Sequence, residues 1–217
     1  MSKRLTRRRF AQAGLAAGVG AFAGPQILPA KAVGANDRVV VGMIGVGNRG
    51  RDLLRDLKGR VDIAAIADVY LPRAREAANS VGAKHVYQDY RKLLERDDVD
   101  AVVIATPHRW HALNSIHAAQ AGKDIYCEKP LSYSIREGRL IVEAVRKHKR
   151  VLQVGTQLRS QERVYRGCMH VRNGSIGKVN RVLAVNYHSP MEIKHPAQDI
   201  PKGLDWDMWC GPAEPPP

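Results

Sequence analysis

Cysteine, aromatic residues and long apolar runs are all scarce in this sequence of 217 residues. The three cysteines, Cys127, Cys168 and Cys210, form no Cys-x-x-Cys pair, and an odd number leaves at least one thiol unpaired within the chain. Cys127 closes an apolar run and is expected to be a small core residue. No metal site is expected, because the eight histidines show no His-Glu-x-x-His pattern and no cysteine pair has zinc spacing.

The low aromatic content, 6% of residues, argues against a nucleic-acid partner, since single strands need aromatic platforms on which bases stack. The formal net charge is +14, but the lysines and arginines are scattered along the chain and are not clustered with aromatics. The apolar run at residues 11–23 is too short and too weakly apolar for a stable membrane span. Neither a nucleic acid nor a stable membrane span is therefore expected.

The N-terminus has the order of regions found in an export signal. Adjacent arginines in Thr6-Arg-Arg-Arg-Phe10 precede the alanine- and glycine-rich run, and Ala30-Lys-Ala32 is a candidate cleavage site. Residues 1–32 are therefore predicted to be a twin-arginine signal peptide, with the export machinery as a partner and a periplasmic or extracytoplasmic location. The alternative is a disordered basic tail. Removal of this segment lowers the charge to +8, because it holds six basic residues and no acidic one.

Residues 39–50 combine an apolar run with the pattern Gly-x-Gly-x-x-Gly, which is typical of a dinucleotide-binding turn between a strand and a helix. Gly45 is expected to permit the tight turn, Gly47 to let the backbone approach a pyrophosphate, and Gly50 to let the helix pack against its strand. The phosphates would then lie at the helix start, where backbone N–H groups and the helix dipole favour negative charge.

A second apolar run, residues 61–67, ends in Asp68, which follows Gly50 by 18 residues. A carboxylate at that spacing binds the adenosine ribose hydroxyls and repels a 2′-phosphate, so NAD is favoured over NADP. The nearby Arg49, Arg51 and Arg73 weaken this preference, and NADP stays possible.

Strand and helix patterns alternate from residue 39 to residue 155 with short connections, which predicts an α/β fold with a doubly wound parallel sheet. The Rossmann domain is predicted over residues 37–157. Residues 158–217 are predicted to begin a second, α+β domain with a mostly antiparallel sheet, whose first strand covers residues 178–188. No further element is visible after residue 188, so the sequence is expected to lack most of that domain.

These features together resemble the Gfo/Idh/MocA family of oxidoreductases. The resemblance covers about residues 38–188 and rests on the glycine pattern, Asp68, Ala105-Thr-Pro107, Glu128-Lys-Pro130 and Ile176-Gly-Lys-Val179, with Leu204-Asp-Trp-Asp-Met-Trp209-Cys-Gly-Pro similar to exported members. It implies that Lys129 holds or deprotonates a substrate hydroxyl beside the nicotinamide and that Glu128 orients the ribose or the lysine.

The resemblance also implies a cis peptide at Lys129-Pro130 and homo-oligomers of the full-length form. His108 departs from the common Asp or Asn of the family, whereas His111 matches many relatives. The cofactor-binding residues expected from the glycine pattern and the resemblance are Gly45, Gly47, Asn48, Arg49, Gly50, Asp68, Thr106, Pro107, His111, Glu128, Lys129 and Pro130.

The sequence therefore predicts an NAD-dependent oxidoreductase that transfers hydride between a sugar, cyclitol or derivative and a tightly bound nicotinamide cofactor. One alternative is a non-catalytic dinucleotide-binding module or inactive fragment. A second is a glycosidase that uses NAD for transient oxidation of a ring carbon.

Overall fold

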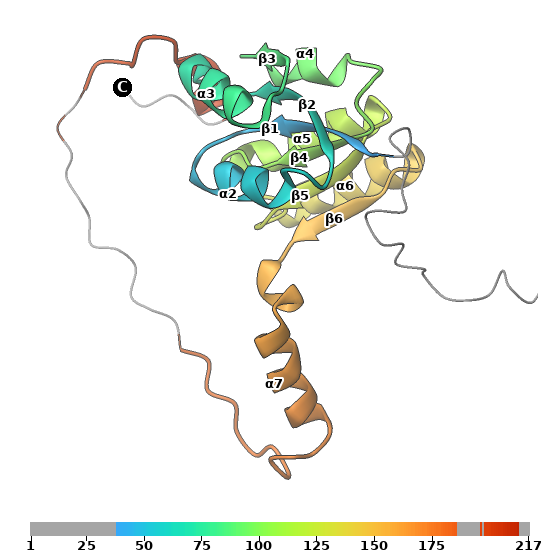
Figure 1. Cartoon of the computed structure of the whole chain (residues 1–217). Coiled ribbons are helices and arrows are strands. Elements are labelled where there is room, and N and C mark those ends of the chain that lie inside the picture. The colour runs from blue at the N-terminus through green and yellow to red at the C-terminus, as the bar shows by residue number, and fades with distance from the viewer. Residues whose placement is uncertain (1–37, 186–195, 197, 213–217) are drawn as a thin grey trace, which may run out of the picture. The chain divides into compact units, whose positions relative to one another are not determined.

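The computed structural model describes residues 38–185, 196 and 198–212, so the predicted signal peptide at residues 1–32 lies outside the described residues. Its centre is a six-stranded parallel sheet with the strand order β3-β2-β1-β4-β5-β6 (Figure 1). The strands are β1 Val40–Ile44, β2 Asp62–Ala67, β3 His85–Tyr87, β4 Ala101–Ile104, β5 Asp124–Glu128 and β6 Leu152–Gly155. This confirms the doubly wound parallel sheet.

Helices connect successive strands, as the alternating pattern predicts. They are α2 Asn48–Leu57, α3 Leu71–Val81, α4 Tyr90–Leu94, α5 His111–Gln120 and α6 Ile135–Lys147, followed by α7 Glu162–Arg172 and α8 Trp206–Cys210. Local signals fix their ends. Gly82 closes α3 in the left-handed conformation, and the Ser134 and Glu137 side chains form a capping box at the start of α6.

The core has two parts, one on each face of the sheet. Side chains of α2 and α3, such as Leu53 and Ala77, pack with Met43 on one face. Side chains of α4 and α5, such as Leu93 and Ala118, pack with Ile44 on the other face. Because successive residues of a strand point to opposite faces, β1 contributes to both parts. The carboxyl ends of the parallel strands are thereby held at one edge, where ligands of such sheets bind.

The predicted first strand of the second domain is not observed over residues 178–185, and residues 186–188 lie outside the described residues. Val182, Leu183 and Val185 are largely exposed there. Strand-forming residues make a strand only when a neighbouring strand supplies hydrogen bonds and a face to pack on, and within the described residues this stretch pairs with none. The expectation of a strand from propensity alone was wrong for these residues.

The expectation of no further element after residue 188 was also wrong. The short helix α8 follows an isolated antiparallel bridge between Tyr70 and Leu204. Five helical residues are too few to produce a readable periodicity, and the helix is held instead by contacts with distant loops. In α6, Ile141 is buried, whereas Ile135 is 90% exposed because it is the first helical residue, beside the cap.

Candidate functional site

The glycine turn has the geometry that the sequence predicts. Gly45 has a φ of +84°, a conformation that side chains disfavour, and a Cβ there would lie 2.9 Å from the Ala105 carbonyl. A Cβ on Gly50 would overlap the Gly45 carbonyl oxygen, so α2 packs directly on the turn. A Cβ on Gly47 would meet no atom within 4 Å. Gly47 therefore leaves open space at the start of α2, a helix with no side-chain cap.

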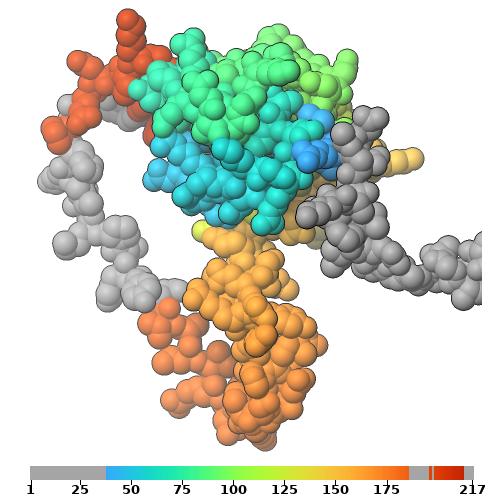
Figure 2. All heavy atoms as spheres, in the orientation of Figure 1, coloured from blue at the N-terminus to red at the C-terminus, as the bar shows by residue number. Residues whose placement is uncertain are grey.

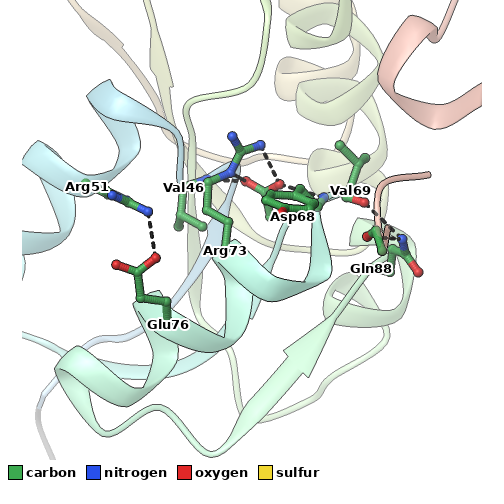
Figure 3. Close-up of polar contacts among 9 residues, drawn as sticks. Val46, Arg51, Asp68, Val69, Arg73, Glu76 and Gln88 are labelled. Atoms are coloured by element: carbon green, nitrogen blue, oxygen red, sulfur yellow. Dashed lines mark hydrogen bonds and ion pairs between the residues drawn. The ribbon is translucent and has the colours of Figure 1, made fainter. Parts of the chain in front are cut away.

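Asp68 lies at the end of β2 with its carboxylate held in place by four hydrogen bonds (Figure 3). Its Oδ2 accepts from the backbone N–H of Val46 at 2.8 Å, and its Oδ1 accepts from that of Tyr70 at 2.9 Å. The Arg73 guanidinium donates to both oxygens, at 3.1 and 2.8 Å. Asp68 is buried, whereas Arg73 is about one-third exposed. The site thus presents a fixed carboxylate with a more accessible positive charge beside it.

A cavity of about 260 Å³ opens between the glycine turn, Asp68 and the loop after β4. Its volume is near the lower end of the roughly 300–1,000 Å³ typical of ligand pockets, so it suits one half of a dinucleotide. The residues that line it are Ile44, Gly45, Gly47, Ala67, Asp68, Val69, Arg73, Gln88, Tyr90, Ala105, Thr106, Pro107, Trp110, Asn114, Met208 and Trp209.

The loop after β4 is tied to its surroundings by two buried side chains. Asn114 donates from Nδ2 to Thr106 Oγ1 at 3.1 Å, and its Oδ1 finds no hydrogen-bond partner among the described residues. His111 is 1% exposed, with Nδ1 2.6 Å from the Pro130 carbonyl oxygen and Nε2 2.9 Å from that of Thr106. Its ring therefore links the Thr106 and Pro130 loops and lies outside the cavity lining. His108 is exposed and stacks on Tyr133.

The end of β5 carries a buried carboxylate next to an exposed lysine. Glu128 Oε1 accepts from Arg49 Nε at 2.7 Å, and this bond raises the pKa of Arg49. Glu128 Oε2 accepts from the backbone N–H of Lys129 at 3.1 Å. The Lys129-Pro130 peptide is cis, as predicted. Because Arg49 belongs to the first turn of α2, the ion pair joins the glycine turn to the backbone that carries Lys129.

Packing around Glu128 depends on a glycine that sequence reasoning did not single out. A Cβ on Gly155, in the neighbouring strand β6, would lie 3.0 Å from Glu128 Oε1 and 2.8 Å from the Tyr126 hydroxyl. Burial, followed by the charge of Glu128, raises the pKa of Tyr126. The glycine at this strand end thus makes room for two polar groups beside the predicted catalytic pair.

The structure brings some of the predicted site residues to the cavity and places the others around it. Those that line the cavity are Gly45, Gly47, Asp68, Thr106 and Pro107; those outside the lining are Asn48, Arg49, Gly50, His111, Glu128, Lys129 and Pro130. Cofactor contact by each of them stays a prediction.

Several cavity residues were not predicted. Trp110 and Asn114 are four residues apart at the start of α5, so helical spacing could have placed them on one face. No local sequence signal connects Gln88, Met208 and Trp209 to the cavity, which they reach only through the tertiary fold.

Comparison with known proteins finds similarity in family and in fold. Residues 39–156 match the model of the Gfo/Idh/MocA oxidoreductase family, described as having an NAD-binding Rossmann fold. A myo-inositol 2-dehydrogenase of Thermotoga maritima is 32% identical over 152 residues, which are 69% of this chain and 45% of that protein.

Two solved structures are similar as well. The myo-inositol 2-dehydrogenase of Lactobacillus plantarum has a TM-score of 0.62 at 26% identity, over 65% of this chain and 43% of that one. A 3-ketoreductase from Actinomadura kijaniata, in complex with TDP-benzene and NADP, has a TM-score of 0.62 at 28% identity, over 65% and 44%. The chain spans less than half the length of these relatives.

Within residues 38–185, 196 and 198–212, no helix is long and apolar enough to cross a membrane. No group of three or more histidine, cysteine, aspartate or glutamate side chains in the same ranges could hold a metal ion.

Proposed function

The chain belongs to the Gfo/Idh/MocA family of oxidoreductases with an NAD-binding Rossmann fold, and from that premise we propose that it is the cofactor-binding part of an NAD(P)-dependent oxidoreductase acting on a sugar, cyclitol or derivative. The names of its relatives, inositol dehydrogenases and a 3-ketoreductase, support this substrate class. The observation that carries the proposal is the placement of Glu128 and Lys129 at the carboxyl end of β5, tied through Arg49 to the glycine turn.

The residues of the chain fit a dinucleotide. Gly47 leaves the space that a pyrophosphate needs at the start of α2, and Asp68 offers a fixed carboxylate for ribose hydroxyls. Asn114 adds a buried oxygen without a partner among the described residues, which suits a donor on a ligand. When bound, the nicotinamide supplies hydride transfer to or from a carbinol carbon.

In this proposal Lys129 exchanges a proton with the substrate hydroxyl at its Nζ atom, while Glu128 acts as a positioning residue. The lysine side chain is exposed at a strand end, where substrate can reach it. The Glu128 carboxylate is buried and accepts from the Lys129 N–H, so it fixes the backbone from which the lysine projects. Arg49 compensates the buried negative charge.

We further propose export through the predicted signal at residues 1–32. Little free nicotinamide cofactor exists outside the cytoplasm, so an exported enzyme would keep its cofactor bound and regenerate it within one catalytic cycle. Coupled oxidation and reduction of two sugars, or glycoside cleavage through transient oxidation, meets that requirement. Native mass spectrometry of protein from the exported fraction should show retained dinucleotide; protein that arrives empty and consumes added NAD stoichiometrically would contradict the closed cycle.

The test of the oxidoreductase is Lys129→Ala, with Lys147→Ala on the exposed face of α6 as the matched control. The assay follows NADH absorbance with inositols and hexoses, and calorimetry measures NAD affinity in parallel. Loss of turnover by about 10²-fold or more, with NAD affinity unchanged, is expected for Lys129→Ala alone. Turnover that survives this substitution would refute the role of Lys129, and tight NAD binding without any turnover in the unsubstituted chain would favour the non-catalytic module.

A further inference from the structure

Residues 203–211, called here the C-terminal segment, lie outside the range that the family model matches, yet two of them line the cavity beside Asp68. These two are Met208 and Trp209. We propose that the C-terminal segment is part of the cofactor site and forms the wall that contacts the adenosine half of a bound dinucleotide. This inference rests on the proposed function, because it requires a dinucleotide in the cavity.

The first half of the C-terminal segment is attached to the loop that follows Asp68. In Figure 2 the red spheres of this part of the chain lie against the teal spheres of the domain. The Leu71 N–H donates to the Gly203 carbonyl at 3.0 Å, and the Asp205 N–H donates to the Val69 carbonyl at 3.0 Å. The Gln88 amide donates to both of these carbonyls, at 2.9 Å to Val69 and 3.1 Å to Gly203. Main-chain and side-chain hydrogen bonds therefore fix the segment directly beside the predicted ribose-binding carboxylate.

The second half is attached to the loop after β4, on the other side of the cavity. The Trp110 indole N–H donates to the Met208 carbonyl at 2.9 Å, and the Arg109 guanidinium donates to the Trp209 carbonyl at 2.6 Å. Gly211 has a φ of +61° and lies so close to the Trp110 ring that a Cβ there would overlap it. Since both loops that bound the cavity hold the segment, it closes the space between them.

The wall offers a bound adenosine the ring of Trp209, which lines the cavity. The Arg109 guanidinium lies 4.6 Å from the centroid of the Trp209 ring, and Trp206 stacks on the same ring at 5.0 Å. The ring is thus held in place but remains 37% exposed, which leaves apolar surface for a ligand.

The position of the cavity also indicates that it takes the adenosine half of the dinucleotide. Asp68, the expected partner of the adenosine ribose, lines it, whereas Lys129 lies outside the lining. Asn114 also lines the cavity, and its buried Oδ1 atom has no hydrogen-bond partner among the described residues.

The experiment measures the dissociation constants of NAD, AMP and nicotinamide mononucleotide for the whole chain by calorimetry. Trp209→Ala removes the wall side chain, and Gly211→Ala detaches the segment through a residue outside the cavity lining. Tyr165→Ala, on the exposed surface of α7, is the matched aromatic control. Circular dichroism confirms that each variant retains its helical content.

Trp209→Ala and Gly211→Ala should each weaken NAD and AMP binding about tenfold, the loss expected when roughly 50 Å² of apolar contact disappears, and leave nicotinamide mononucleotide binding unchanged. Equal affinities for AMP in both variants and the unsubstituted chain would overturn the inference while leaving cofactor binding intact. An unsubstituted chain that binds neither NAD nor NADP would overturn the proposed function, and the inference with it.

Discussion

The second and third glycines of the turn, Gly47 and Gly50, should separate cofactor binding from folding when each is replaced by alanine. In Gly50→Ala the new methyl group overlaps the Gly45 carbonyl and lies 3.0 Å from its carbon, and both atoms are backbone that cannot rotate away. Overpacking of this kind costs about 1–3 kcal/mol, and the upper end applies because backbone must move. Alanine regains roughly 1 kcal/mol of helix propensity, which leaves a net loss of about 2 kcal/mol.

In Gly47→Ala the methyl group meets no atom within 4 Å, and the φ of −66° suits any residue. The unfolding free energy should therefore change by less than about 1 kcal/mol. The same methyl group projects beside the cavity, where backbone must approach a pyrophosphate, so NAD affinity should fall by about tenfold or more.

Thermal unfolding followed by circular dichroism, together with NAD calorimetry, measures both effects. Gly50→Ala should lower the melting temperature by about 4–8 °C, and Gly47→Ala should leave it nearly unchanged. The reasoning would be refuted by a Gly47→Ala chain that binds NAD as tightly as the unsubstituted one, or by a Gly50→Ala chain with an unaltered melting temperature.

Three more predictions concern charge, pH and capping. Arg73→Ala removes the partly exposed cation beside Asp68 and should weaken NADP binding about tenfold more than NAD binding. Arg166→Ala, whose arginine pairs with the exposed Glu162 on α7, is the control, and an unchanged ratio of the two affinities in Arg73→Ala would contradict the prediction. Burial raises the pKa of Cys127 to about 11 and that of Tyr90 to about 12. Above about pH 9 the folded state therefore keeps protons that the unfolded state loses. The free energy of unfolding, measured in urea, should fall as the pH rises from about 9 to 12. Cys127→Ala should make the fall between pH 9 and 11 shallower. Ser134→Ala removes the cap of α6 and should lower the free energy of unfolding by about 1 kcal/mol in the same urea assay. An unchanged free energy of unfolding would show that the capping box contributes nothing.

Local sequence signals predicted a structural feature correctly where all the interactions that cause it lie within one short segment. The glycine turn depends on backbone conformations that only glycine adopts readily, so Gly45 and Gly50 could be assigned their roles from spacing alone. The strands of a parallel sheet are buried on both faces, and their apolar runs were located to within about two residues. The capping box of α6 likewise needs only Ser134 and the glutamate three residues later, whereas the cis peptide at Lys129-Pro130 was expected from the family resemblance.

Propensity failed where an element depends on a partner that the local sequence does not specify. Residues 178–185 are rich in strand formers, yet they form no strand, because the described residues provide none beside them. The helix α8 showed the converse, since its five residues carry no periodicity and gain their position from hydrogen bonds to Trp110 and Arg109.

The sequence by itself determined the parallel sheet, the glycine turn and the carboxylate at its expected distance, because each follows from the order and spacing of neighbouring residues. Only the tertiary structure decided how Arg73 holds both oxygens of Asp68, how Arg49 reaches Glu128 across 79 residues, and how Met208 and Trp209 come to the cavity. Contacts of this kind depend on where separate elements meet in space, and packing of the two sheet faces, not local spacing, fixes those meeting points.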